Sequence, residues 1–254
     1  MIADQSDLDV HPPTPPRPRP RWGLLDVALG VPYIVICATA GLAVGLLVAS
    51  VVGGDESDLA IGVIGLAGLQ IGLGTWPALV SRWKGTGMGP DWRLRLRPVD
   101  LPVGIGTGVI ALGAGGVVGA IVAAVLGLDE SDRATNTGPI VEASGTVWLP
   151  LLVLIVVVVG PTAEEIFFRG LLLRSAEKRI GIASAVVVSS LLFALVHFQG
   201  DGWAATLVLL SVIGTAGAVF AVVTVRSDRL GSAIVGHMTF NGVAVLAALA
   251  TSAA

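Results

Sequence analysis

The sequence predicts an all-α membrane protein, a polytopic bundle of about seven to eight transmembrane helices. Of its 254 residues, 54% are hydrophobic and only 13% are charged. A soluble domain carries about twice that share of charged residues. Continuous apolar runs of about 18 residues or more recur, and about 20 such residues in a helix cross a hydrocarbon core about 30 Å thick. Continuous runs favour helices over a barrel, whose strands alternate apolar and polar residues.

Each of seven apolar runs is assigned to one span. The predicted spans are residues 24–52, 59–80, 101–128, 147–174, 182–198, 203–225 and 230–250. They divide the chain into a proline-rich tail over 1–22, a group of N-terminal transmembrane helices over 23–145, and a C-terminal helical core over 146–254. An amphipathic segment is predicted near residues 82–100, because DWRLRLRPVD (91–100) alternates basic and apolar residues. We expect it to lie along the cytoplasmic headgroups.

The basic residues orient these spans. With the N-terminus in the cytoplasm, every Lys and Arg except Arg133 falls on the cytoplasmic side or in the cytoplasmic half of a span. Cytoplasmic loops carry an excess of Lys and Arg, so the pattern predicts a cytoplasmic N-terminus. A composition rich in Ala, Gly, Val and Arg indicates a bacterium of high GC content. The expected location is therefore the bacterial plasma membrane.

Glycine and tryptophan lead to two expectations about packing. Gly41/Gly45 and Gly68/Gly72 repeat at four-residue spacing, which lets helices approach closely within the bundle. The six tryptophans lie at or near predicted span ends. Because an amphipathic indole suits the lipid–water interface, we expect Trp92 and the others there.

Two adjacent acidic residues interrupt the apolar run that begins near residue 147. Ionisable side chains at membrane depth cost about 2.5–3.5 kcal/mol each on insertion scales, so they tend to face a bundle interior and to mark function. Glu165 and Arg169 lie at i and i+4, the favourable order for an acidic–basic pair. Glu164 is rotated by about 100° from its neighbour, and we expect its carboxylate to face the bundle interior. Pro161 lacks an N–H and therefore frees a backbone carbonyl beside the site.

Two later apolar runs each carry one histidine. His237 and Asn241 lie at i and i+4, so both project from one face of the last span. At 1.5 Å per residue, Glu164 lies about 15 Å, His237 about 12 Å and Asn241 about 18 Å from the cytoplasmic ends of their spans. These three residues can therefore meet at one level. His197 is about 24 Å deep, nearer the outer side, and fits that level less well.

This set of side chains is typical of amide hydrolysis. A carboxylate in an apolar cavity is a stronger base than one in water, and beside a histidine it can deprotonate a water molecule that attacks a carbonyl. A second histidine and an Asn amide can donate hydrogen bonds to the developing oxyanion. Alternatively, Glu164, His197 and His237 could hold zinc, as two His and one Glu do in metallopeptidases. No serine or cysteine is well placed as a nucleophile, and the single cysteine, Cys37, excludes an internal disulfide framework.

Three short patterns resemble those of the CAAX prenyl protease family, also called the CPBP or Abi family of intramembrane proteases. Residues 164–169 (EEIFFR) match its EExxxR motif, residues 193–197 (FALVH) match FxxxH, and residues 237–241 (HMTFN) match HxxxN. Each pattern alone is weak, whereas all three in order on separate spans are specific. The first 145 residues carry no motif of this family.

The resemblance implies a helical endopeptidase whose site opens toward the cytoplasm, with residues 146–254 as its catalytic core. By this resemblance, Glu164 with His197 activates water, while His237 and Asn241 stabilise the oxyanion. The acidic–basic pair of the first motif holds the architecture of the site. No cofactor is required in the preferred interpretation, and zinc is the alternative.

Two other functions are compatible with the same sequence features. The expected partners are a membrane protein or peptide substrate and the lipid bilayer, with no nucleic acid, while the oligomeric state and the substrate are undetermined. One alternative is a non-catalytic immunity or assembly protein of the same fold. Another is a proton-coupled transporter that uses Glu and His as a relay. The polar residues do not repeat between the two halves, which weakens an inverted-repeat transporter.

Overall fold

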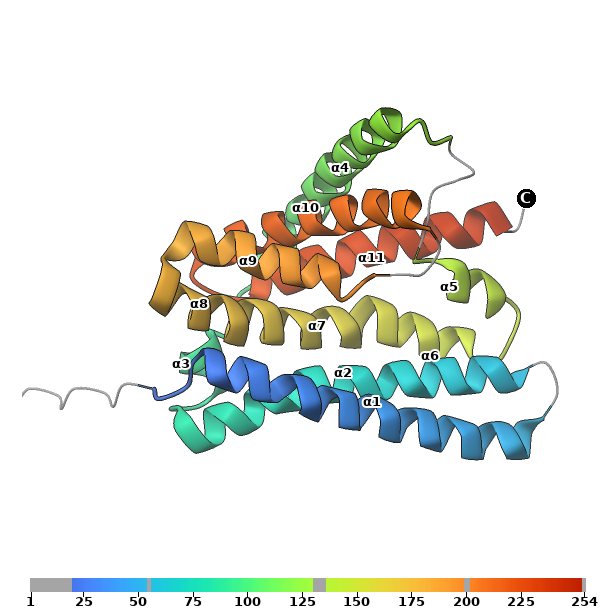
Figure 1. Ribbon diagram of the computed structural model, residues 1–254, viewed down its shortest axis with the longest axis horizontal. Helices are drawn as coiled ribbons and strands as arrows, with labels where there is room; N and C mark the ends of the chain where they lie inside the picture. The colour runs from blue at the N-terminus through green and yellow to red at the C-terminus, as the bar shows by residue number, and fades with distance from the viewer. Residues whose placement is uncertain (1–19, 54–55, 130–135, 199–201, 253–254) are drawn as a thin grey trace, which may run out of the picture.

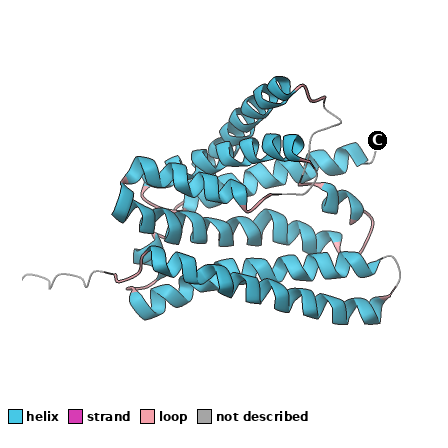
Figure 2. Ribbon diagram, in the orientation of Figure 1, coloured by secondary structure: helices cyan, strands magenta, loops and turns pink. Residues whose placement is uncertain are grey.

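The computed structural model describes residues 20–53, 56–129, 136–198 and 202–252. These residues form helices and no strand (Figure 2), so the all-α prediction is confirmed. The long helices are α1 (Leu24–Val52), α2 (Ser57–Lys84), α4 (Asp100–Leu126), α10 (Trp203–Ser227) and α11 (Gly231–Ser252). One composite helix runs through α6 (Leu149–Leu154), η3 (Ile155–Val159), α7 (Gly160–Glu165), η4 (Ile166–Leu172) and α8 (Leu173–Ile180). The shorter helices are α3 (Met88–Trp92), α5 (Gly138–Glu142) and α9 (Ile182–Leu195).

The described residues contain 6 helices long and apolar enough to cross a membrane: α1, α2, α4, the composite helix Leu149–Ile180, α10 and α11. The chain is therefore a multi-pass membrane protein, as predicted. The fifth predicted span, residues 182–198, is the exception. Helix α9 has 14 residues and is about 21 Å long, which is too short to cross a hydrocarbon core of about 30 Å.

The composite helix lies in the middle of the bundle (Figure 1). The antiparallel hairpin of α1 and α2 covers one side of it, and α9, α10 and α11 cover the other, with α4 packed against α10 and α11. We name the two ends of the bundle the α3 end and the α5 end, after the short helices found there. The α3 end holds the start of α1, the end of α2 and the turns that join α8 to α9 and α10 to α11 (Figure 1).

Small residues set the distance between α1 and α2. A Cβ added to Gly68 would lie 2.5 Å from the carbonyl oxygen of Cys37 and 2.9 Å from the Cα of Gly41. Only glycine allows the two backbones to approach this closely. The expectation of close helix contacts within the bundle is confirmed, and this contact holds α2 in place two residues before Gln70.

The start of the segment 91–100 is part of the core. Trp92 is 0% exposed, so the expectation that it lies at the lipid interface is wrong. Its ring lies 4.7 Å from the ring of Trp22, and its Nε1–H donates to the carbonyl oxygen of Pro77 at 3.2 Å. The indole thus satisfies its one polar group within the protein and needs no interfacial water. Leu96, further along, is 70% exposed.

Candidate active site

The centre of the site is a buried ion pair on the composite helix. Glu165 and Arg169 are both 0% exposed, and Nη1 of Arg169 lies 3.0 Å from Oε1 of Glu165. The predicted pairing at i and i+4 is confirmed. Nη2 of Arg169 also donates to the carbonyl oxygen of Gly217 on α10 at 2.9 Å. The guanidinium lies 4.3 Å from the ring centre of Phe193, a favourable cation–π distance.

His237 joins this ion pair to the cavity. Its Nδ1 lies 3.0 Å from Oε1 of Glu165, and because a carboxylate only accepts, Nδ1 carries the proton of this hydrogen bond. The imidazole stacks on Phe220 at 4.9 Å. Its other nitrogen, Nε2, lies 3.7 Å from Oε2 of Glu164. Glu165 therefore orients the ring so that Nε2 is presented to the neighbouring carboxylate.

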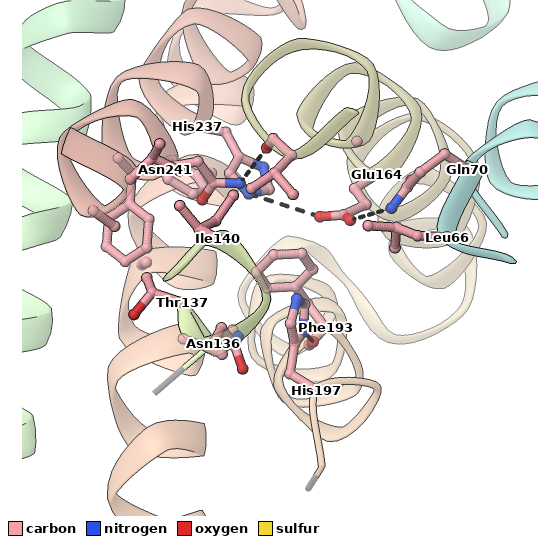
Figure 3. A pocket seen from close by; sticks show the side chains of 18 residues that line it. Leu66, Gln70, Asn136, Thr137, Ile140, Glu164, Phe193, His197, His237 and Asn241 are labelled. Atoms are coloured by element: carbon pink, nitrogen blue, oxygen red, sulfur yellow. Dashed lines mark hydrogen bonds and ion pairs between the residues drawn. The ribbon is translucent and has the colours of Figure 1, made fainter. Parts of the chain in front are cut away.

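Glu164 is held from the opposite side by α2. Nε2 of Gln70 donates to Oε1 of Glu164 at 3.1 Å (Figure 3). Gln70 is only 5% exposed, and its Oε1 has no hydrogen-bond partner among the described residues. Sequence reasoning missed this residue. The available signal was a lone amide within an apolar span, without the histidine at i−4 that singled out Asn241.

The backbone around Pro161 explains how Asn241 is placed. In η3 the N–H of Gly160 bonds to the carbonyl of Ile155, five residues back. The next bond of that series would run from residue 161 to Val156, and proline has no N–H to make it. Nδ2 of Asn241 donates to the carbonyl oxygen of Val156 instead, at 2.8 Å. The expectation that Pro161 frees a carbonyl is confirmed, and the second N–H of the Asn241 amide is not used in this bond.

His197 lies apart from the other motif residues, just beyond the last residue of α9. Its Nδ1 lies 2.8 Å from the carbonyl oxygen of Phe193. A carbonyl only accepts, so this nitrogen carries the proton and Nε2 keeps its lone pair. Within the described residues, no hydrogen bond or ion pair joins His197 directly to Glu164. This agrees with the sequence-based expectation that His197 lies deeper from the cytoplasmic side than Glu164 does.

One cavity of about 230 Å³ brings the candidate residues together (Figure 3). Its lining includes Gln70, Asn136, Glu164, His197, His237 and Asn241. An adjoining, mainly apolar groove of about 700 Å³ runs between α1, α2 and α9. Gln70, Glu164 and His197 line both spaces. The carboxylate of Glu164 thus lies where the polar cavity meets an apolar surface.

The three residues of the zinc alternative are not grouped as a metal site. Among the described residues, no three His, Cys, Asp or Glu side chains are grouped so that they could hold a metal ion. Glu164 and His237 lie together, but His197 is on a separate part of the cavity wall. The residues as arranged therefore do not fit the zinc alternative.

Comparison with known proteins identifies the part of the chain that carries this site. Residues 146–243 match the family described as type II CAAX prenyl endopeptidase Rce1-like. This segment is similar to that family, and we call residues 146–243 the CPBP segment, after the family that the three motifs resemble. The CPBP segment contains all three motifs and therefore Glu164, His197, His237 and Asn241. Gln70 and Asn136 lie outside it.

A curated relative supports the same family. The chain is 29% identical over 137 residues to "Putative membrane peptidase YdiL" of Bacillus subtilis (strain 168). The match covers 54% of this chain and 52% of that protein, so the chain spans about half the length of the curated relative that it matches. No solved structure matches the chain. The two matches support a membrane protease at the level of the family.

Proposed function

We propose that this protein is an intramembrane endopeptidase that hydrolyses a peptide bond of a membrane-associated protein or peptide. The observation that carries the proposal is the contact between Oε2 of Glu164 and Nε2 of His237, which lie 3.7 Å apart. Both residues belong to the CPBP segment and both line the cavity. At this separation, one water molecule or carbonyl oxygen beside the pair can contact both the carboxylate and the imidazole.

Hydrolysis by these residues follows a general-base route. Glu164 takes a proton from water as the water oxygen attacks the scissile carbonyl, with Nε2 of His197 as the second acceptor for the water. The carbonyl π electrons move to oxygen. The second N–H of Asn241 donates to the oxyanion, and so does Nε2 of His237 in the doubly protonated form of the ring, since Nδ1 already donates to Glu165. The proton on Glu164 then passes to the leaving nitrogen, and the C–N bond breaks to give a carboxylic acid and an amine. General-base catalysis contributes about 10²–10⁴-fold, and one oxyanion donor about 2.7–4 kcal/mol.

The buried ion pair has a positioning role in this proposal. Glu165 accepts the Nδ1 proton of His237, so the ring keeps one orientation, and Arg169 balances the charge of Glu165. Gln70 keeps the carboxylate of Glu164 in one orientation by donating a hydrogen bond to one of its oxygens. Prearranged groups of this kind need no reorganisation during the reaction.

The test compares the N-termini of membrane proteins from cells that carry wild type, Glu164→Gln or His197→Ala. We expect at least one N-terminus that is produced by wild type and absent in both variants at equal protein level. The same N-termini in all three strains would contradict the proposal. A parallel arm with a metal chelator tests zinc, because a zinc enzyme would lose activity in that arm.

A further inference from the structure

The cavity lies toward the α5 end of the bundle. Asn136 and Thr137, which precede α5, line it together with His197 beyond the end of α9 (Figure 3). Ala244, on the second half of α11, also lines it. Among the described residues, none that lines the cavity comes from α3, α8 or the turn between α10 and α11. The lining of the cavity around Glu164 therefore extends toward the α5 end and not toward the α3 end.

The opposite end is closed by packed side chains. Phe168, Leu171, Trp92 and Leu230 lie between the site and the α3 end, and each is at most 3% exposed. These four side chains fill the interior on this side of the cavity, and the groove that passes Phe168 between α1, α2 and α9 is mainly apolar.

A polar cap reinforces the closure at the start of α4 and α11. Nε of Arg229 and Oγ of Ser232 both donate to Oδ1 of Asp100, at 2.7 Å and 2.6 Å. Asp100 is 1% exposed and Ser232 is 0% exposed. These hydrogen bonds join the start of α11 and the turn before it to the start of α4. The α3 end is therefore stabilised by hydrogen bonds as well as by apolar packing.

Charge separates the same two ends. The described Lys and Arg residues other than buried Arg169 all lie at or within two turns of the α3 end: Arg21, Arg82, Lys84, Arg93, Arg95, Arg97, Arg174, Lys178, Arg179, Arg226 and Arg229. The described charged residues at the α5 end are acidic: Glu56, Asp58, Asp129 and Glu142. Basic residues near span ends stay on the cytoplasmic side. The closed end is therefore the cytoplasmic one.

We propose that the cavity opens to the extracytoplasmic face and receives its substrate from there. That the cavity receives a substrate rests on the proposed function. The side on which the cavity opens rests on the geometry and the charge distribution alone. It differs from the cytoplasmic opening that the family resemblance implies. The substrate class that fits is an exported peptide, or a membrane protein whose scissile bond lies in an outer juxtamembrane stretch.

Two glycines provide matched reporters of sidedness. Gly138 on α5 and Gly89 on α3 both have open space where a Cβ would be placed, so cysteine fits at either position. Each is introduced separately into the full chain with Cys37→Ala, which leaves one thiol. We expect a membrane-impermeant maleimide to modify the Gly138→Cys variant in intact cells, and the Gly89→Cys variant only in inverted vesicles. The reverse pattern would overturn the proposal.

A third reporter tests the cavity itself. Ala244 lines it and is not among the proposed reacting residues. We expect sulfonatoethyl methanethiosulfonate, a small anionic reagent, to modify the Ala244→Cys variant at least tenfold faster in intact cells than in inverted vesicles. Faster reaction in inverted vesicles, or no reaction from either side, would overturn the proposal.

These labelling experiments need no catalysis, so they separate this inference from the proposed function. If labelling occurs as expected but wild type and Glu164→Gln cells have the same N-termini, the proposed peptidase fails and the outward opening stands. If Glu164-dependent N-termini are found, we expect them within outer segments of the cleaved proteins. Cleavage only in cytoplasmic segments would contradict the inference while leaving the peptidase in place.

Discussion

The two walls of the cavity differ in origin and in chemistry. The motif wall consists of Glu164, His197, His237 and Asn241 and lies within the CPBP segment. The N-terminal wall consists of Leu66, Gln70, Asn136, Thr137 and Ile140 and lies outside it. The first wall holds all the ionisable groups of the cavity, and the second holds apolar and neutral polar groups. In this molecule the groups proposed to react therefore come from the CPBP segment, whereas Gln70, which holds Glu164 in place, comes from the N-terminal part of the chain.

The largest effect is expected on the motif wall. Glu164→Gln removes the proposed base and keeps the side chain's size and its acceptor for Gln70. We expect the initial rate of cleavage to fall by about 10²–10⁴-fold, with an unchanged unfolding temperature in detergent. Retention of more than a tenth of the wild-type rate would show that this carboxylate is not the base.

Substitution of the neighbouring carboxylate, Glu165, should lower the stability of the fold, which Glu164→Gln leaves unchanged. Glu165→Gln leaves the Arg169 charge buried without its anionic partner, and breaking a buried pair in this way costs about 3–5 kcal/mol. We expect that loss in the free energy of unfolding measured with denaturant. Glu177→Gln on the exposed side of α8 is the control and should change stability by less than about 0.5 kcal/mol. Equal effects of the two substitutions would contradict the structural role of the ion pair.

A third effect tests how the N-terminal wall is supported. Gly68→Ala places a methyl group against the backbone of α1, and overpacking of this kind costs about 1–3 kcal/mol. Gly62→Ala on the same helix meets open space and should leave stability equal or slightly higher. Thermal unfolding in detergent measures both. If the two variants unfold at the same temperature, the α1–α2 contact does not hold the wall.

Gln70→Leu tests the N-terminal wall directly. A hydrogen bond to a charged group is worth about 1.5–3 kcal/mol, so we expect kcat to fall about tenfold or more with little change in KM. Stability should stay the same or rise, because leucine also removes the unpartnered Oε1. A peptide that spans an identified cleavage site is the assay substrate. A lower unfolding temperature with unchanged kcat would mean that Gln70 serves only the fold.

The smallest effect concerns pH at the α3 end. Burial by itself raises the pKa of Asp91, but hydrogen bonds from Ser81 and Thr86 outweigh it and hold the pKa below its usual value. Such a carboxyl contributes stability that is present above the unfolded pKa of about 3.9 and is lost as pH falls through the folded value. We expect Asp91→Asn to cost about 1 kcal/mol at pH 7. A difference from wild type that stays constant down to pH 3 would contradict this assignment.

Some features of the site were predictable because they depend on local spacing. The i and i+4 spacing placed Glu165 against Arg169, and the absence of an N–H predicted the free carbonyl beside Pro161. Gln70 could not be found in the same way, since its contact with Glu164 depends on how α2 is rotated against a helix that lies 94 residues later in the chain.

The burial of Trp92 was missed for a related reason. A tryptophan at the end of an apolar run suits the lipid interface equally well, and only the fold of α3 against Trp22 and Leu230 encloses it. The length of α9 was also misjudged, because apolar residues continue past the point where the helix ends at Leu195.

The sequence by itself determined that this chain is an all-α membrane protein, which ionisable residues lie at membrane depth, and which of them pair along one helix. These properties follow from transfer free energy and from a period of 3.6 residues, and both act locally along the chain. Only the tertiary structure decided that Gln70 holds Glu164, that His197 lies apart from His237, and that the α3 end is closed. Those features depend on the rotation and separation of packed helices, which side chains distant in sequence decide together.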